Sequence, residues 1–200
     1  MTKDNKDWSS NTASHRTTTP NTYTDVNREQ HDYYATEPKA LELLLEHEGF
    51  SDKVWECSCG EGHLSQVLVA AGKDVVSSDL IDRGYGKVQD FLCLSNTGPG
   101  DRDIITNPPF KFTNEFLVKA MSILDEGRKI AFFLPIRYVE GKARRQLFQR
   151  FPLKTVYVSS GRLICAINGD FETITGSATA YAWFIWEKGY EGPTELKWFN

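Results

Sequence analysis

The sequence predicts an α/β protein with a mostly parallel β-sheet covered by helices on both faces. Three observations lead to this prediction: short segments rich in Val, Ile and aromatic residues, longer segments with helical periodicity between them, and Gly or Pro at many of the junctions. Parallel strands need a long crossover connection, and a helix is the usual one. With 200 residues, 40% of them hydrophobic and 25% charged, the chain is long enough for one domain and a tail.

The elements follow one another with clear start and stop signals. After Thr36, Pro38 suits the first turn of a helix, leucines follow at helical spacing, and Gly49 ends it. A strand then runs into a turn containing Gly60 and Gly62, and the alternation continues from there. Strands are expected at 54–57, 74–79, 104–107, 129–134, 155–159 and 178–186. Further helices are expected at 64–71, 116–124 and 143–151.

The composition and the apolar runs of the sequence predict an N-terminal tail and argue against a membrane-spanning or secreted protein. Residues 1–30 consist mainly of Asn, Thr, Ser, Asp and Lys, so they are expected to form a disordered or loosely docked tail before a domain at 31–200. The longest apolar runs fall far short of the roughly 20 residues of a membrane span. The first residues also lack the apolar core of a secretion signal. We therefore expect a cytoplasmic protein without a membrane partner, while its oligomeric state stays open.

Four cysteines, Cys57, Cys59, Cys93 and Cys165, are expected to be reduced thiols in that compartment. Their only close pair is spaced C-x-C, and no His completes a familiar zinc-binding spacing. We therefore expect no metal.

A glycine turn and an acidic residue indicate a nucleoside-containing cofactor. The segment Glu56-Cys57-Ser58-Cys59-Gly60-Glu61-Gly62 joins a strand to a helix, whose N-terminus presents free N–H groups. Asp79 follows Gly60 by 19 residues, at the end of the next strand, where a carboxylate can accept hydrogen bonds from ribose hydroxyls. Ligands of such sheets bind beyond the carboxyl ends of the strands. A turn that uses glycine only for its backbone conformation is the alternative.

The choice of cofactor depends on two residues of this segment. A dinucleotide fingerprint needs a glycine or alanine where Ser65 stands, and Glu56 would repel a pyrophosphate. A cofactor with an ammonium or sulfonium group would instead be attracted by Glu56, and S-adenosylmethionine is such a cofactor. Asp90 and Phe91 are candidates for its adenine amino group and ring; a loop acid and a core Phe are the alternative.

The expected strand at 104–107 ends in the segment Asn107-Pro108-Pro109-Phe110. Two prolines restrict the backbone and remove donors, so the Asn107 side-chain oxygen and the Pro108 carbonyl can both accept hydrogen bonds from a planar amino group. Two fixed acceptors stabilise the positive charge that develops on such a nitrogen when it attacks. Phe110 can stack on the ring that carries the amine. A proline-rich loop beside a core Phe is the alternative.

Together, Thr36-Glu37-Pro38, the Glu56–Gly62 segment, Asp79, Asp90-Phe91 and Asn107–Phe110 resemble the successive motifs of the amino-group DNA methyltransferases. The sequence is most similar to small phage- or prophage-type adenine N6-methyltransferases, over roughly residues 30–190. The resemblance implies a Rossmann-like class I methyltransferase fold with a seven-stranded sheet and an antiparallel C-terminal strand. It also implies S-adenosylmethionine as methyl donor and N6 of adenine in DNA as acceptor.

The resemblance implies roles for individual residues. Asn107, Pro108, Pro109 and Phe110 would form the catalytic motif. The expected cofactor-binding residues are Tyr34, Thr36, Pro38, Glu56, Cys57, Ser58, Gly60, Gly62, Asp79, Leu80, Asp90 and Phe91.

Two departures from the family leave the acceptor open. Many sequence-specific enzymes of this type carry a separate target-recognition domain, for which 200 residues leave no room, so low or partner-supplied specificity is expected. Protein glutamine N5-methyltransferases and RNA adenine methyltransferases share the N-P-P-aromatic motif, because an amide nitrogen needs the same two acceptors. A non-catalytic nucleic-acid-binding module with a degenerate pocket is a further alternative.

Local charge favours a nucleic acid among these acceptors. Residues 137–154 contain six basic side chains and one acid, on a chain whose net charge is −4. Such a patch suits phosphates, although a solvated helix face is the alternative. The candidate nucleic-acid-binding residues are Phe112, Arg137, Tyr138, Lys142, Arg144 and Arg145, with Phe112 and Tyr138 expected to stack on an extruded base.

Overall fold

The computed structural model describes residues 33–95, 98, 100–167, 169, 171 and 179–200. The expected tail at 1–30 and the expected first residue of the last strand, Ala178, lie outside these residues. The helices are α1 (Pro38–His47), α2 (His63–Ala70), α3 (Thr113–Ile123) and α4 (Lys142–Arg150). The strands are β1 (Tyr34–Thr36), β2 (Lys53–Glu56), β3 (Asp74–Asp79), β4 (Lys87–Val88), β5 (Asp103–Thr106), β6 (Lys129–Pro135), β7 (Leu153–Val158), β8 (Cys165–Ile167), β9 (Tyr181–Glu187) and β10 (Glu195–Trp198).

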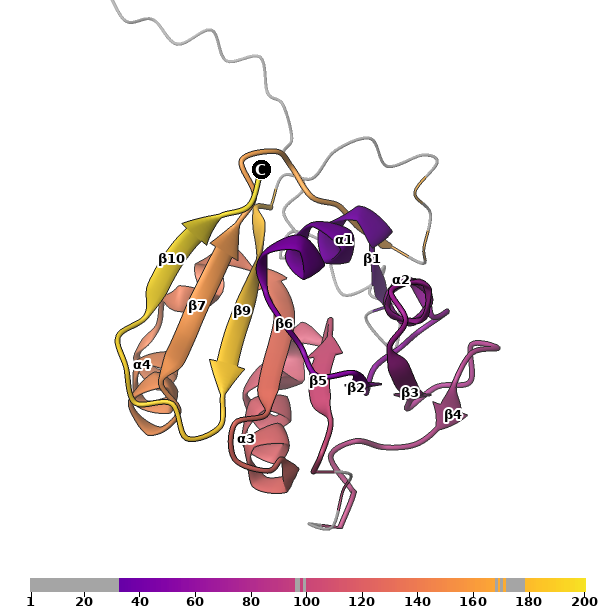
Figure 1. Ribbon diagram of the computed structural model, residues 1–200, viewed down its shortest axis with the longest axis horizontal. Helices are drawn as coiled ribbons and strands as arrows, with labels where there is room; N and C mark the ends of the chain where they lie inside the picture. Colours follow the sequence, from indigo (N-terminus) through magenta and orange to yellow (C-terminus); the bar gives the residue numbers. More distant parts are fainter. Residues whose placement is uncertain (1–32, 96–97, 99, 168, 170, 172–178) are drawn as a thin grey trace, which may run out of the picture.

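Eight strands form the main sheet in the order β10-β7-β9-β6-β5-β2-β3-β4 (Figure 1). All run parallel except β9, which lies antiparallel between β6 and β7. The expected mostly parallel sheet with an antiparallel strand near the C-terminus is therefore confirmed. The order of the strands reverses at β2, which pairs with β3 on one side and β5 on the other, so the switch point lies between β2 and β5.

Helices cover both faces of this sheet (Figure 1). Side chains alternate along β9, so Phe184 and Trp186 pack toward α3 and α4 while Trp183 and Ile185 pack toward α1 and α2. All four are 0% exposed. A strand buried on both faces has a continuous apolar sequence, which is why this segment was recognisable.

Several short strands were not expected from the sequence. Strand β10 pairs with β7 at the edge of the main sheet, which therefore has eight strands where seven were expected. All four residues of β10 are exposed, so it shows no alternation of buried and exposed positions. A separate two-stranded sheet pairs β1 with β8 in antiparallel fashion. Thr36 belongs to β1, and the residue that precedes helix α1 is Glu37, with Pro38 in the first turn. No helix among the described residues is long and apolar enough to cross a membrane.

Candidate active site

A cavity of about 610 Å³ opens at the carboxyl ends of β2, β3 and β5, beside the switch point of the sheet. Its size falls within the range of small-molecule sites. The sequence-predicted residues that line it are Tyr34, Thr36, Glu56, Cys57, Ser58, Asp79, Leu80, Asp90, Phe91, Asn107, Pro108, Pro109, Phe110 and Phe112.

Three of the predicted cofactor residues do not line the cavity. Pro38 lies in the first turn of α1, where its missing N–H costs nothing. Gly60 and Gly62 have φ values of 54° and 86°, the left-handed conformation that favours glycine. A Cβ atom on Gly60 would also collide with the ring of Tyr33. The two glycines therefore shape the turn, and other residues form the wall of the cavity.

Glu56 is a buried carboxyl group at the end of β2, with 2% of its surface exposed. The Ser65 hydroxyl, on α2, donates a hydrogen bond to its Oε2 and also lies 2.6 Å from the Ser77 hydroxyl of β3. Burial raises the pKa of Glu56 to about 8, while the hydrogen bonds from Ser65 act in the opposite direction. The side chain is therefore mostly neutral at pH 7, and a cation beside it would favour its ionised form.

Asp79 holds the glycine turn against the end of β3. Its Oδ2 accepts the Gly60 N–H at 2.8 Å, and its Oδ1 accepts the Ile81 N–H at 3.0 Å. Each carboxylate oxygen keeps a second lone pair, so the group can still accept hydrogen bonds from a ligand in the cavity. Leu80, 57% exposed, and Ile81 add apolar surface beside it.

Asp90 and Phe91 line another part of the cavity wall. Asp90 Oδ1 accepts the Leu92 N–H at 2.9 Å, and hydrogen bonding from Cys93 lowers the pKa of the Asp90 carboxyl group. Phe91 is 2% exposed and packs edge-on against Trp55, with ring centroids 5.3 Å apart. Phe91 is therefore both a core residue and part of the cavity wall.

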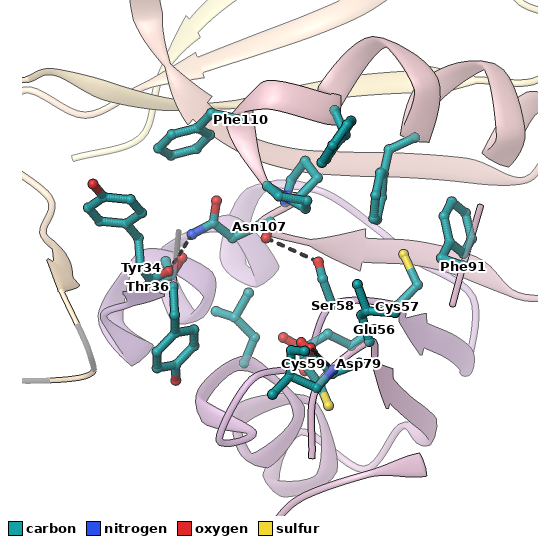
Figure 2. Close-up of a pocket in the computed structure, with 18 of the residues that line it drawn as sticks. Tyr34, Thr36, Glu56, Cys57, Ser58, Cys59, Asp79, Phe91, Asn107 and Phe110 are labelled. Carbon is teal, nitrogen blue, oxygen red and sulfur yellow. Dashed lines mark hydrogen bonds between the residues drawn. The ribbon is translucent and has the colours of Figure 1, made fainter. Parts of the chain in front are cut away.

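Asn107 lies at the centre of the cavity, and its side-chain amide has a defined orientation (Figure 2). Its Nδ2 donates to the backbone carbonyl of Tyr34 at 2.8 Å and lies 3.7 Å from Cys165 Sγ. Its Oδ1 is buried without a hydrogen-bond partner among the described residues. The Ser58 hydroxyl donates to the Asn107 backbone carbonyl at 3.1 Å, which joins the ends of β2 and β5. An acceptor is thus held ready at the junction of the two strands.

Two aromatic rings lie on one side of Asn107. Phe110 stacks on Tyr34 with ring centroids 5.9 Å apart and an interplanar angle of 21°. In Figure 2 this pair lies on the opposite side of Asn107 from Glu56 and Asp79. The Pro109 carbonyl accepts the Phe112 N–H at 2.8 Å, so the Pro108 carbonyl remains the candidate for a second acceptor. The cavity therefore has a polar side and an aromatic side with the amide between them.

Neither a protein-family model nor a curated protein matches the sequence. Solved structures match in fold. A protein from Listeria monocytogenes assigned to the class I S-adenosylmethionine-dependent methyltransferases gives a TM-score of 0.53 at 14% identity, over 80% of this chain and 61% of that one. A predicted O-methyltransferase from Agrobacterium tumefaciens gives 0.55 at 12% identity, over 81% and 84% of the two chains. A TehB-like S-adenosylmethionine-dependent methyltransferase from Corynebacterium glutamicum gives 0.52 at 16% identity, over 76% and 88%.

The chain has the Rossmann-like fold of class I methyltransferases. At these identities the likeness concerns the fold alone, and the chain spans less than two thirds of the Listeria protein. Within the part of the methyltransferase fold that the structure describes, no three His, Cys, Asp or Glu side chains are grouped as a metal site requires.

Tyr33, Arg83 and His63 also line the cavity of this methyltransferase fold and were not among the predicted site residues. The Tyr33 hydroxyl accepts the Glu61 N–H at 3.2 Å, and the Arg83 guanidinium lies 4.2 Å from the centre of the Tyr33 ring. Burial raises the pKa of Tyr33 to about 12. Nothing local in the sequence reveals this pair, because its members come from segments about 50 residues apart; only the position of Tyr33 beside Tyr34 was a signal.

The basic segment after β6 differs from its prediction. Tyr138 is 7% exposed, and its hydroxyl donates to Asn114 Oδ1 at 2.6 Å, so the expectation that it stacks on a base is wrong. The reason is that its ring fills a core position against Phe184. Arg144 Nη1 donates to the backbone carbonyls of Arg137 and Glu140, at 3.1 Å and 2.6 Å. Part of the hydrogen-bonding capacity of this guanidinium is therefore used within its own segment.

The remaining basic residues lie outside the cavity. Arg137 is exposed in the short turn after β6, whereas Lys142 and Arg145 line a shallow surface groove on α4 together with two glutamines. Figure 1 shows α4 beside β7 and β10, toward the opposite end of the sheet from β3 and β4. Of the predicted nucleic-acid residues, only Phe112, 42% exposed, lines the cavity itself.

Proposed function

We propose that the chain is an S-adenosylmethionine-dependent methyltransferase that methylates N6 of adenine in DNA, with low or partner-supplied sequence specificity. One observation carries this proposal: Asn107 lines the cavity beside a stacked aromatic pair, and its buried Oδ1 has no hydrogen-bond partner among the described residues. An unsatisfied buried acceptor costs about 1–3 kcal/mol. A ligand that donates an N–H to it recovers that cost.

The residues on the polar side fit S-adenosylmethionine, which supplies a sulfonium methyl group when it is bound. Glu56, whose pKa is raised by burial, offers a carboxylate to a positively charged group of the ligand. Asp79 keeps lone pairs for ribose hydroxyls, and Leu80 with Phe91 offers apolar surface to the adenine ring. The cavity thereby combines the charge, the acceptors and the apolar wall that this ligand requires.

The residues on the aromatic side fit a planar amine. Asn107 Oδ1 and the Pro108 carbonyl would accept its two N–H groups, which leaves the nitrogen lone pair free to attack the methyl carbon in line with the departing sulfur. With S-adenosylmethionine bound, an N–C bond would form as its C–S bond breaks, and the nitrogen would carry the positive charge until its proton passes to solvent. No general base is required, because that proton is acidic only after transfer.

The stacked pair favours adenine over a glutamine side chain as acceptor. Tyr34 and Phe110 stack on each other and both line the cavity, and an aromatic wall of this kind would stabilise a flat heteroaromatic ring better than an aliphatic amide. Phe112 and Lys111 at the cavity wall suit the flanking nucleotide. The motif resemblance to DNA methyltransferases is what favours DNA over RNA.

A methyl-transfer assay with three acceptors tests the proposal. The purified chain is incubated with S-adenosylmethionine carrying a labelled methyl group and with DNA, RNA or a mixture of proteins, and labelled nucleic acid is digested to nucleosides. The expected product is N6-methyldeoxyadenosine, absent from reactions with Asn107→Ala. Label found in RNA or protein instead of DNA would show that the acceptor is RNA or protein. No transfer to any acceptor would overturn the proposal.

A further inference from the structure

The direction of the Asn107 amide is decided by groups outside the Asn-Pro-Pro-Phe segment. An amide side chain can point either its oxygen or its NH₂ into the cavity, and its neighbours choose between the two. Here the NH₂ has the Tyr34 carbonyl at 2.8 Å and Cys165 Sγ at 3.7 Å. Turning the amide over would bring Oδ1 against the Tyr34 carbonyl, two acceptors in repulsive contact.

Cys165 lies in a small buried group of polar side chains. Its Sγ is 4.0 Å from Thr36 Oγ1 and is hydrogen-bonded with the Tyr181 hydroxyl. The side chain is 9% exposed, and burial raises the pKa of the thiol to about 12, so it stays neutral. The sulfur thereby faces N–H and O–H groups from three different segments of the chain.

The small β1–β8 sheet places both acceptors. Thr36 pairs with Cys165 and Tyr34 with Ile167, so the Tyr34 carbonyl and the thiol are held by one antiparallel ladder. Beyond β1, the Glu37 N–H donates to the Ile164 carbonyl at 3.1 Å, which extends the same connection. The ladder thereby joins segments almost 130 residues apart beside the Asn107 side-chain amide.

We infer that Cys165 is a positioning residue, which together with the Tyr34 carbonyl keeps Asn107 Oδ1 turned toward the acceptor amine. This inference rests on the proposed function. The amide has two N–H donors, and removal of the sulfur leaves them a single acceptor. The amide can then rotate, and the fraction of molecules with a correctly placed Oδ1 falls.

Three variants test the inference. Cys165→Ala removes the acceptor, Cys165→Ser replaces it with a hydroxyl, and Ser122→Ala removes a hydrogen-bonding group from α3, where the Ser122 hydroxyl donates to the Lys119 carbonyl outside the cavity. We expect Cys165→Ala to lower kcat about three- to tenfold, as for loss of one hydrogen bond, with the KM for S-adenosylmethionine changed less than about twofold. Cys165→Ser should recover part of kcat, and Ser122→Ala should match the wild type.

Two kinetic outcomes would overturn the inference. Wild-type kcat in Cys165→Ala shows that the thiol has no influence on the amide. A parallel loss of cofactor affinity and thermal stability, without a selective loss of kcat, shows that its role is packing alone.

A measurement without turnover separates this inference from the proposed function. In ¹⁵N-labelled protein, the Asn107 NH₂ protons should exchange slowly with solvent and should shift and exchange faster in Cys165→Ala. An unchanged NH₂ signal overturns the inference whichever acceptor is methylated. A shifted signal in a chain that methylates no nucleic acid keeps the positioning role of Cys165 and refutes the adenine acceptor.

Discussion

The buried Glu56 carboxyl group predicts a pH dependence of both stability and ligand binding. Its pKa in the folded chain is about 8, against 4.5 for an ordinary Glu, which corresponds to about 5 kcal/mol against the ionised form. Because the folded state holds the proton more tightly than the unfolded state, this group contributes fully to stability below about pH 4.5. The contribution is lost progressively as the pH rises through about 8.

Replacing Glu56 with Gln removes this titration while keeping an acceptor for the Ser65 hydroxyl. Urea unfolding between pH 5 and pH 9 should show wild-type stability decreasing relative to Glu56→Gln by up to about 5 kcal/mol. The carbonyl oxygen of Gln still accepts the hydrogen bond, so the two proteins should be close in stability at the acidic end. Parallel stability curves for the two proteins across this range would refute the burial of an ionisable group at this site.

Binding of S-adenosylmethionine should also depend on the protonation of Glu56. A cation beside Glu56 lowers its pKa, so binding near pH 7 should release close to one proton, and affinity should rise with pH up to about 8. Calorimetry in buffers of different ionisation enthalpy counts that proton. Glu56→Gln should release none, and an equal proton count in both proteins would show that Glu56 does not face the ligand's charge.

Three further predictions concern Asn107, the glycine turn and the basic surface of α4. Asn107→Ala should abolish methyl transfer and leave S-adenosylmethionine affinity within about tenfold, measured by calorimetry; retained transfer removes the amide from the mechanism. Gly60→Ala should destabilise the chain by about 1–3 kcal/mol in thermal unfolding, because φ is 54° and the added Cβ meets the Tyr33 ring; unchanged stability would mean that the turn adapts. Charge reversal at Lys142 and Arg145 should weaken DNA binding and flatten its salt dependence, and an unaltered salt slope would assign α4 to a solvated face.

Much of the fold was predictable because its signals are local. The β3 strand begins and ends where expected, at Asp74 and Asp79, because the β-branched residues Val75 and Val76 follow the turn at Gly72. The glycine turn after β2 and the prolines after β5 mark where the chain leaves the sheet. Parallel strands end at one edge, so residues that follow them had to converge. Glu56, Asp79 and Asn107 do line one cavity.

The errors arose where burial depends on distant segments. Tyr138 sits in a basic, polar segment, yet its ring fills a core position against Phe184 from β9, so the sequence pattern could not distinguish an inward from an outward ring. The edge strand β10 has no apolar alternation and exists only because β7 offers free backbone groups. In both cases the deciding partner lies dozens of residues away.

The sequence by itself determined the alternation of strands and helices, the two turns that bear the candidate chemistry and the residue types placed there. Only the tertiary structure decided which way the Asn107 amide points, because its NH₂ is held by a carbonyl from Tyr34 and a thiol from Cys165. Those groups come from segments far apart in the sequence and meet through the β1–β8 ladder. Hydrogen bonds are short-ranged in space but not in sequence, so an orientation set by them leaves no local pattern to read.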